Sequence, residues 1–207
     1  MAINHNMNIL SLLSFFIATV YLYLAALVLI RERSHSRCRS LFILMLCLSV
    51  WSFAHTFLYA SQSANERWFW YRFSSIGWCL APAALLHFSF DLAGLASRSA
   101  FRRAPIIAYA CGAAFLARSM TGSLVAVDFS VMTFGYNIVM FPASPWLWPF
   151  LGYSLLAIAS SIALIARFGL RSGEWNAGRQ AVILVTTLLA AIIPAAALNV
   201  LLPFLGV

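Results

Sequence analysis

The chain has 207 residues, of which 63% are hydrophobic and only 9% are charged, and its mean hydropathy is +0.91. Because soluble domains usually carry about 25% charged residues, this composition excludes an ordinary soluble protein. The chain has 13 arginines, no lysine and five acidic residues, which give a formal net charge of +8. These arginines lie mostly in short segments between apolar runs, so they indicate membrane topology, and nucleic acid is not an expected partner.

Six apolar runs divide the chain, and a membrane-spanning helix takes about 20 such residues. They lie at residues 8–30, 41–60, 68–95, 104–120, 146–168 and 181–207. The fourth run is the weakest and needs Arg118 to extend its side chain to the membrane surface. No stretch alternates with the two-residue period of a barrel strand. The sequence therefore predicts an all-α membrane protein, a bundle of about six transmembrane helices, with residues 1–207 as one domain.

The connecting segments alternate between strongly basic and nearly neutral, which predicts the orientation. Segments after the first, third and fifth runs hold Arg31, Arg33, Arg37 and Arg39, then Arg98, Arg102 and Arg103, then Arg167, Arg171 and Arg179. Arginine-rich short loops stay in the cytoplasm. We therefore expect a multi-pass protein of the bacterial inner membrane with its N-terminus outside, and its first run as a retained helix, not a cleaved signal peptide.

The external segment 121–145 is long enough to form structure of its own. Its two stretches LVAVDFSVMTF and YNIVMF are rich in β-branched and aromatic residues and flank Gly135. This pattern favours a β-hairpin on the outer rim of the bundle. The alternative is an irregular loop that rests on lipid headgroups.

Polar residues inside the apolar runs are few, and two of them fall at one depth. His55 lies near the outer end of the second helix and Arg72 near the outer end of the third. One hypothesis is an outer-facing ligand pocket that also includes Trp51 and Trp78. The alternative is that Arg72 reaches the outer headgroups while His55 makes one hydrogen bond between helices.

Other polar residues give weaker signals. His87 is about 22 Å along the helix from Arg72, so a haem held by His55 and His87 is not expected. Asp91 is predicted to form a structural ion pair with Arg98 at the inner interface.

In the last run, Pro194 predicts a kink, and Asn199 beyond it is a further candidate for lining a ligand cavity. No catalytic residue, metal site or cofactor is predicted, because the chain has no HExxH, GxSxG or GxxxxGK motif and its cysteines have no CxxC spacing. We do not expect an enzyme within these residues.

An ordered set of segments resembles the N-terminal seven-helix sensing region of bacterial histidine kinases. The set comprises LCLSVWSFAHTFLYA, WYRFSSIGWCLAPAALLHFSF, VMTFGYNIVMFPASPW and GRQAVILV. The resemblance implies a receptor-like input module for a small or membrane-borne signal, with the bilayer, an unidentified small-molecule or lipid ligand and a second copy of the chain as partners. The competing interpretations are a small permease or transporter subunit and a structural assembly subunit.

The resemblance also bears on the native sequence beyond Val207. The related region has seven helices and a cytoplasmic output domain, whereas this sequence contains six runs. We therefore expect the native reading frame to continue with about 20 apolar residues, a basic segment and a soluble signalling domain.

Overall fold

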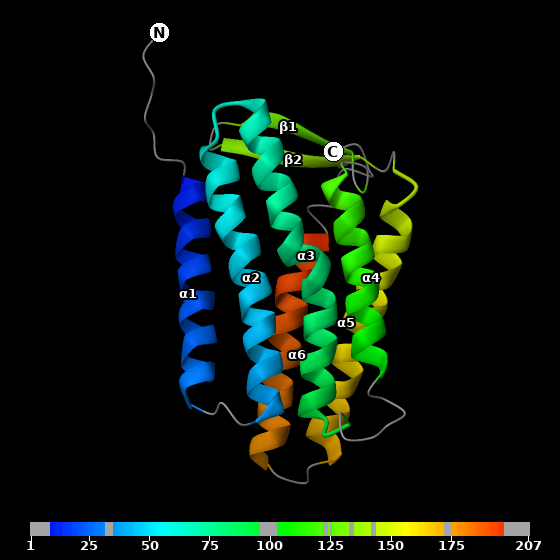
Figure 1. The fold of residues 1–207 in the computed structure, drawn as a ribbon. Helices are drawn as coiled ribbons and strands as arrows, with labels where there is room; N and C mark the ends of the chain where they lie inside the picture. Colours follow the sequence, from blue (N-terminus) through cyan, green and yellow to red (C-terminus); the bar gives the residue numbers. More distant parts are fainter. Residues whose placement is uncertain are drawn as a thin grey trace.

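In the computed structural model, the described residues form six helices and a two-stranded sheet (Figure 1). The structure describes residues 9–31, 35–95, 103–121, 124, 126–132, 135–141, 144–171 and 175–196. In chain order the elements are α1 (Ile9–Arg31), α2 (Ser36–Ala60), α3 (Ala64–Leu92), α4 (Arg103–Met120), β1 (Ala126–Met132), β2 (Gly135–Phe141), α5 (Leu147–Arg171) and α6 (Trp175–Ala196). The prediction of an all-α membrane protein built from about six helices is confirmed.

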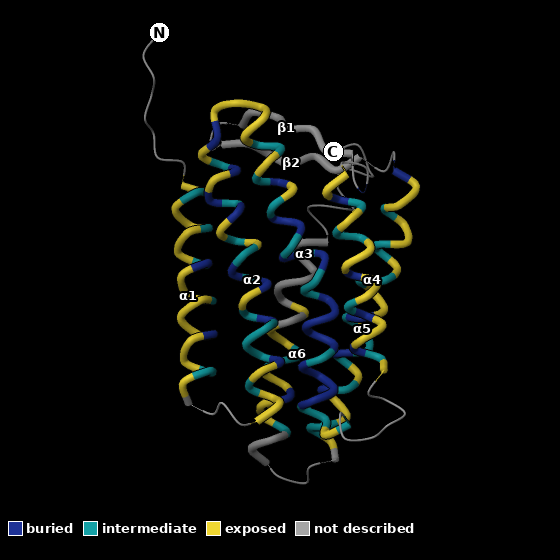
Figure 2. The backbone as a smooth tube through the Cα atoms, viewed as in Figure 1, coloured by how far each residue is buried: buried dark blue, intermediate teal, exposed yellow. Residues whose placement is uncertain are grey.

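The helices gather around α3. In the described part of the chain α3 packs against α2, α4 and α5, while α1 packs on α2 and α6 packs on α5. Figure 2 shows the consequence, since buried positions concentrate along α3 and α1 is mostly exposed. A helix buried on several faces needs apolar or small residues on all of them. The buried positions of α3 accordingly include serine, glycine, alanine and cysteine.

Two glycines bring helix backbones close together. A Cβ atom built on Gly77 of α3 would lie 2.5 Å from the carbonyl oxygen of Cys47 and 2.6 Å from Cβ of Trp51, both on α2. A Cβ atom on Gly112 of α4 would lie 2.9 Å from the carbonyl oxygen of Cys79 on α3. Small residues of this kind allow the close packing on which helix association in lipid depends.

Serine hydroxyls fix α1 against α2. Ser11 donates to the carbonyl oxygen of Thr56 at 2.8 Å, and Ser49 donates to the carbonyl oxygen of Ala18 at 3.0 Å. Hydrogen bonds between membrane helices contribute about 0.6 kcal/mol each on average. Their main effect here is therefore to set the register of the two helices.

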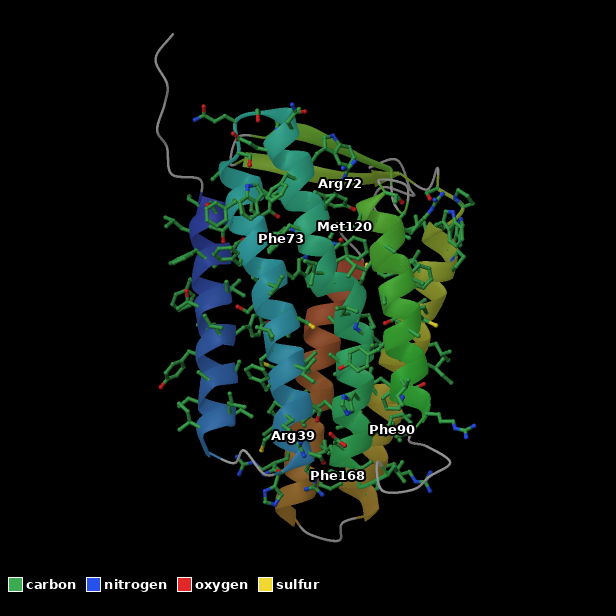
Figure 3. All side chains as sticks on the ribbon, in the orientation of Figure 1. Arg39, Arg72, Phe73, Phe90, Met120 and Phe168 are labelled. Carbon is green, nitrogen blue, oxygen red and sulfur yellow. The ribbon has the colours of Figure 1, made fainter. Side chains whose placement is uncertain are left out.

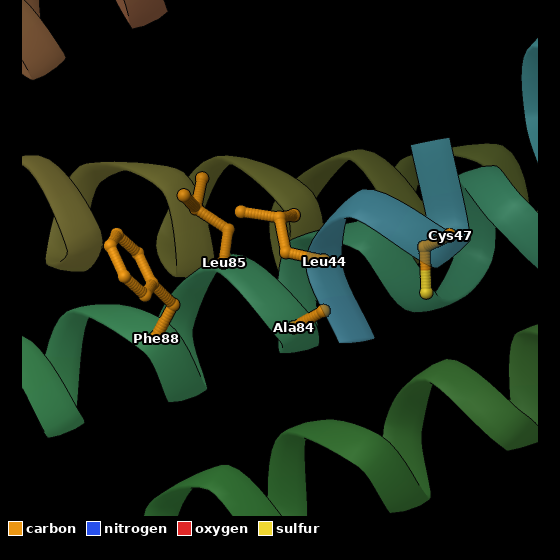
Figure 4. Close-up of a cluster of buried hydrophobic side chains, with 5 residues drawn as sticks. All are labelled: Leu44, Cys47, Ala84, Leu85 and Phe88. Atoms are coloured by element: carbon orange, nitrogen blue, oxygen red, sulfur yellow. The ribbon is translucent and has the colours of Figure 1, made fainter. Parts of the chain in front are cut away.

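A cluster of buried hydrophobic side chains joins α2 to α3 in the half of the bundle away from the sheet (Figure 4). Its members are Leu44, Cys47, Ala84, Leu85 and Phe88. Ile158 of α5 packs against this cluster as well. Tyr109 of α4 packs against it too. The cluster therefore holds four helices together through dispersion contacts, since apolar burial drives little association within lipid.

Several helix ends differ from the predicted runs. The second helix begins at Ser36 and not at 41, and the third spans Ala64–Leu92 and not 68–95. Hydropathy detects the apolar centre of a helix, whereas hydrogen bonding extends the helix into the polar interface. At the start of α3, for example, the Ser63 hydroxyl accepts from the backbone N–H of Glu66 at 3.2 Å, as a helix N-cap does.

The remaining boundaries differ less, except in the last helix. The first, fourth and fifth predicted runs agree closely with α1, α4 and α5. The last helix begins at Trp175 and not at 181, and the predicted stretch 197–207 lies outside the described residues. Trp175 to Gln180 were missed because their composition is too polar for an apolar run.

Among the described residues, four helices are long and apolar enough to cross a membrane by themselves. They are Ile9–Ile30, Ser36–Ala60, Ala64–Leu92 and Leu147–Leu170. Many large apolar side chains on α1, α4 and α5 are exposed, among them Phe16 at 65% and Leu156 at 71%. Such a surface is suited to contact with lipid chains.

Residues 126–132 and 135–141 form the two strands of the expected hairpin. β1 and β2 pair antiparallel, from Ala126 with Phe141 to Met132 with Gly135. The hairpin lies across one end of the bundle, where α2 ends and α3 begins, and β2 contacts α2 (Figure 1). We call this end the hairpin end. The opposite end, where α2 and α4 begin, is called the basic end after Arg37, Arg39 and Arg103.

Candidate functional site

Aromatic rings concentrate between α2 and α3 at the hairpin end. Phe57 stacks on Trp70 with their ring centroids 4.5 Å apart, and Phe53 meets the same indole edge to face at 6.4 Å. Phe73 also packs edge to face against Trp70, at 5.7 Å. Aromatic pairs of this geometry add about 0.5–1.5 kcal/mol beyond area burial. This cluster therefore holds α2 and α3 at a fixed spacing near the predicted pocket.

His55 makes its contacts on its own helix. Its Nδ1 atom lies 3.0 Å from the carbonyl oxygen of Trp51. A carbonyl oxygen only accepts, so Nδ1 carries the hydrogen in this arrangement. The His55 ring packs edge to face on Trp51 at 6.1 Å and on Tyr59 at 5.6 Å. These contacts leave Nε2 of His55 as the ring nitrogen that can accept from a further group.

Arg72 is exposed at the hairpin end of α3, where Figure 3 labels it beside Phe73. Its guanidinium carbon lies 6.0 Å from the centroid of the Trp68 ring, one turn earlier on the same helix. A cation over an indole face gains about 0.5–1 kcal/mol at an exposed position. The stacking directs the Arg72 side chain toward the helix end and leaves its guanidinium open to a polar ligand or a headgroup.

Trp78 belongs to the junction of α3 with α5. Its indole N–H donates to the Ser74 hydroxyl at 3.3 Å, and its ring packs edge to face on Phe150 at 5.1 Å. Leu124 and Cys79 are buried beside these rings. Trp78 therefore packs toward α5, and no described contact joins it to His55.

The predicted site residues thus fall into two groups at similar depth. The stacking of Phe57 on Trp70 and the contact of Gly77 with Trp51 place His55 and Arg72 at one level of the antiparallel pair. The described contacts nevertheless join His55 to α2 and Arg72 to α3, with none between the two residues. Asn199 lies outside the described residues.

A second stacked cation was not predicted from the sequence. Arg118, near the end of α4, holds its guanidinium carbon 5.1 Å from the centroid of the Trp146 ring. Arg118 and Trp146 are far apart in the sequence, so the sequence did not indicate this contact. The contact depends on how the chain returns to the bundle after the hairpin. Two arginines of the hairpin end, Arg72 and Arg118, are therefore held over tryptophan rings.

The basic end contains a polar cluster that was predicted only in part. Asp91 is 4% exposed, and its Oδ2 atom lies 3.7 Å from Nε2 of His87. The predicted partner Arg98 lies outside the described residues. Arg37 of α2 instead donates from Nε to the backbone carbonyl oxygen of Asp91 at 3.2 Å. On the other side, the hydroxyl of Tyr109 on α4 lies 3.4 Å from Nδ1 of His87.

Within the described residues, no three His, Cys, Asp or Glu side chains are placed to hold a metal ion. The polar groups that the structure brings together are cations over aromatic rings at one end and a histidine-carboxylate pair at the other. The bundle is that of a multi-pass helical membrane protein, and these two polar clusters lie near its two ends.

Comparison with known proteins identifies the family. The family described as the N-terminal 7TM region of histidine kinase matches residues 13–207, which is nearly the whole chain. The chain therefore belongs to this family and is a membrane signal-input module. No curated protein and no solved structure matches it.

Proposed function

We propose that this module detects a small or membrane-borne signal at the hairpin end of α2 and α3 and passes it to a kinase output domain. The observation that carries the proposal is the arrangement of Arg72 and the half-buried His55 at one depth beside a rigid aromatic cluster. Trp51, Trp78 and Asn199 are the further candidate residues of this input site. The family supports a receptor role over a permease or an assembly subunit.

The mechanism we propose is a shift between two packings of the bundle. A ligand that binds one packing more tightly increases the population of that packing. Changing the ratio of two states from 1:99 to 99:1 takes about a 10⁴-fold difference in affinity. A weaker ligand would therefore act on a bundle whose two packings are already close in free energy. A homodimer of the chain in the bacterial inner membrane is part of this proposal.

Arg72→Ala is expected to weaken signalling more than stability. Losing one hydrogen bond to a charged group lowers affinity by about tenfold or more, whereas an exposed arginine contributes little to folding. The measurement is autophosphorylation of the full-length kinase in proteoliposomes, together with the thermal midpoint of the purified protein. Arg67→Ala, earlier on α3 at the same end, is the control, although Arg67 is half-buried and donates to the carbonyl oxygens of Gln62 and Ser63. Equal losses of signalling and stability would favour a purely structural Arg72.

The proposed orientation places the hairpin end outside the cell and the basic end in the cytoplasm. Ser63 and Ser36 are both exposed, at opposite ends of α2 and α3. In a variant without the four native cysteines, Ser63→Cys is expected to react with an impermeant thiol reagent in intact cells, as is Ser123→Cys. Ser36→Cys is expected to react only after the membrane is opened. Labelling of Ser36→Cys in intact cells would reverse the orientation.

A further inference from the structure

The polar cluster of Arg37, His87, Asp91 and Tyr109 connects three helices at the basic end. His87 and Asp91 lie one turn apart on α3, Arg37 reaches them from α2 and Tyr109 from α4. None of these contacts is needed to bind a signal at the hairpin end. The cluster is therefore a separate feature of the bundle.

The carboxylate of Asp91 is the group in this cluster whose burial is energetically unfavourable. The side chain of Asp91 is 3% exposed, and its Oδ2 atom accepts no hydrogen bond from the described residues. A buried ionised carboxylate is strongly unfavourable unless a cation or hydrogen-bond donors compensate it. Among the described residues, the group placed to supply both is Nε2 of His87, at 3.7 Å from Oδ2.

We propose that the His87–Asp91 pair is a proton-binding site that holds α3 against α2 and α4. The proton comes from water and binds to the imidazole ring, so that the charge of the pair changes from −1 to zero while the carboxylate stays ionised. Protonated His87 then donates from Nε2 toward Asp91 and from Nδ1 toward the oxygen of Tyr109. Histidine is the side chain whose charge ordinarily changes between about pH 5 and 8.

Loss of the proton loosens the contact between these helices. Neutral imidazole can still share one hydrogen with Asp91, but the buried carboxylate loses its closest counter-charge. Hydrating that carboxylate requires α3 to separate from the neighbouring helices. Because Arg37 bonds to the Asp91 backbone and Tyr109 faces His87, such a separation acts on α2 and α4 together.

The other charged and titratable groups near the pair compensate the carboxylate less directly. From α2, Arg37 is exposed and its bond goes to the main chain, while Cys47 lies further toward the middle of the bundle. From α5, the hydroxyl of Tyr153 donates to the carbonyl oxygen of Cys79, two to three turns away from His87 on α3. The other described arginines exposed at the basic end are Arg39, Arg103, Arg167 and Arg179. Water screens these exposed cations.

The test is the thermal midpoint of the purified protein in phosphatidylcholine nanodiscs at about pH 6 and about pH 8.5, on the two sides of histidine titration. The wild-type midpoint is expected to be higher at the lower pH by about 2–4 °C, the shift typical of one ion pair in a chain of this size. A wild-type midpoint that does not change between these two conditions would overturn the proposal without any variant.

Variants assign the effect to the pair. His87→Gln and Asp91→Asn are each expected to abolish the pH difference, and the double variant is expected to change it no further. His87→Lys supplies a charge that does not titrate in this range, so its midpoint should stay high under both conditions, which also covers the case in which His87→Gln does not fold. His35→Gln is the matched control, because His35 is exposed at the start of α2, and it should keep the wild-type difference. If His87→Gln keeps that difference, or if Arg37→Gln abolishes it, the proton site is not at His87.

Discussion

Replacing Gly77 with alanine is expected to destabilise the bundle by about 1–3 kcal/mol or more. The new methyl group would lie 2.5 Å from the carbonyl oxygen of Cys47 and 2.8 Å from the backbone nitrogen of Trp51. Both are main-chain atoms and cannot move away as a flexible side chain does, so α2 and α3 must separate. The measurement is the free energy of unfolding in detergent micelles.

The sign of the change in stability shows whether close packing or helix propensity dominates at Gly77. Alanine favours a helix over glycine by about 1 kcal/mol, so a glycine with space around it should gain stability on the same substitution. Gly152 of α5 has no atom within 4 Å of a built Cβ, and Gly152→Ala is therefore the matched control, expected to be neutral or stabilising. A stable Gly77→Ala protein would contradict the close approach of α2 and α3.

Phe88→Ala is expected to cost about 3–5 kcal/mol of unfolding free energy. Phe88 is 8% exposed and belongs to the cluster that joins α2, α3 and α5 (Figure 4). Removing its ring leaves a cavity among Leu44, Leu85 and their neighbours, and the lost dispersion contacts are not replaced by lipid. The same unfolding titration measures the effect.

The control for Phe88 is a phenylalanine that faces outward. Phe16 of α1 is 65% exposed, so Phe16→Ala removes the same group without creating a cavity and should change stability by less than about 1 kcal/mol. Equal effects of the two substitutions would mean that the Phe88 cluster does not determine stability.

The fold was predictable to the extent that it depends on hydropathy. Long apolar runs determine which segments span a membrane, so the number and order of the helices followed from the sequence. The helix ends did not, because Ser36 to Ser40 and Ala64 to Arg67 are polar and yet continue the hydrogen bonding of α2 and α3. Hydropathy measures the environment of a side chain, whereas a helix boundary depends on main-chain hydrogen bonds.

For the candidate site, the sequence predicted the depth of the residues in the bundle, but it did not predict the directions of their side chains. The rise of 1.5 Å per residue places His55 and Arg72 at one level, and the aromatic stack of Phe57 on Trp70 agrees with that register. Which way each side chain points depends on how α4 and α5 pack around α3. For the same reason the sequence did not reveal that Tyr109 meets His87, since the two residues are on different helices.

The buried serines of α3 bear on how this helix can move along its own axis. Ser74, Ser75 and Ser89 each donate to a carbonyl oxygen of α3 itself, so axial sliding of α3 would break none of these hydrogen bonds. Among the described residues, contacts from three neighbouring helices would oppose such sliding: Tyr153 of α5 to the Cys79 carbonyl, Arg37 of α2 to the Asp91 carbonyl, and the Tyr109 hydroxyl of α4 to His87. The axial position of α3 is therefore set by side chains of α5, α2 and α4.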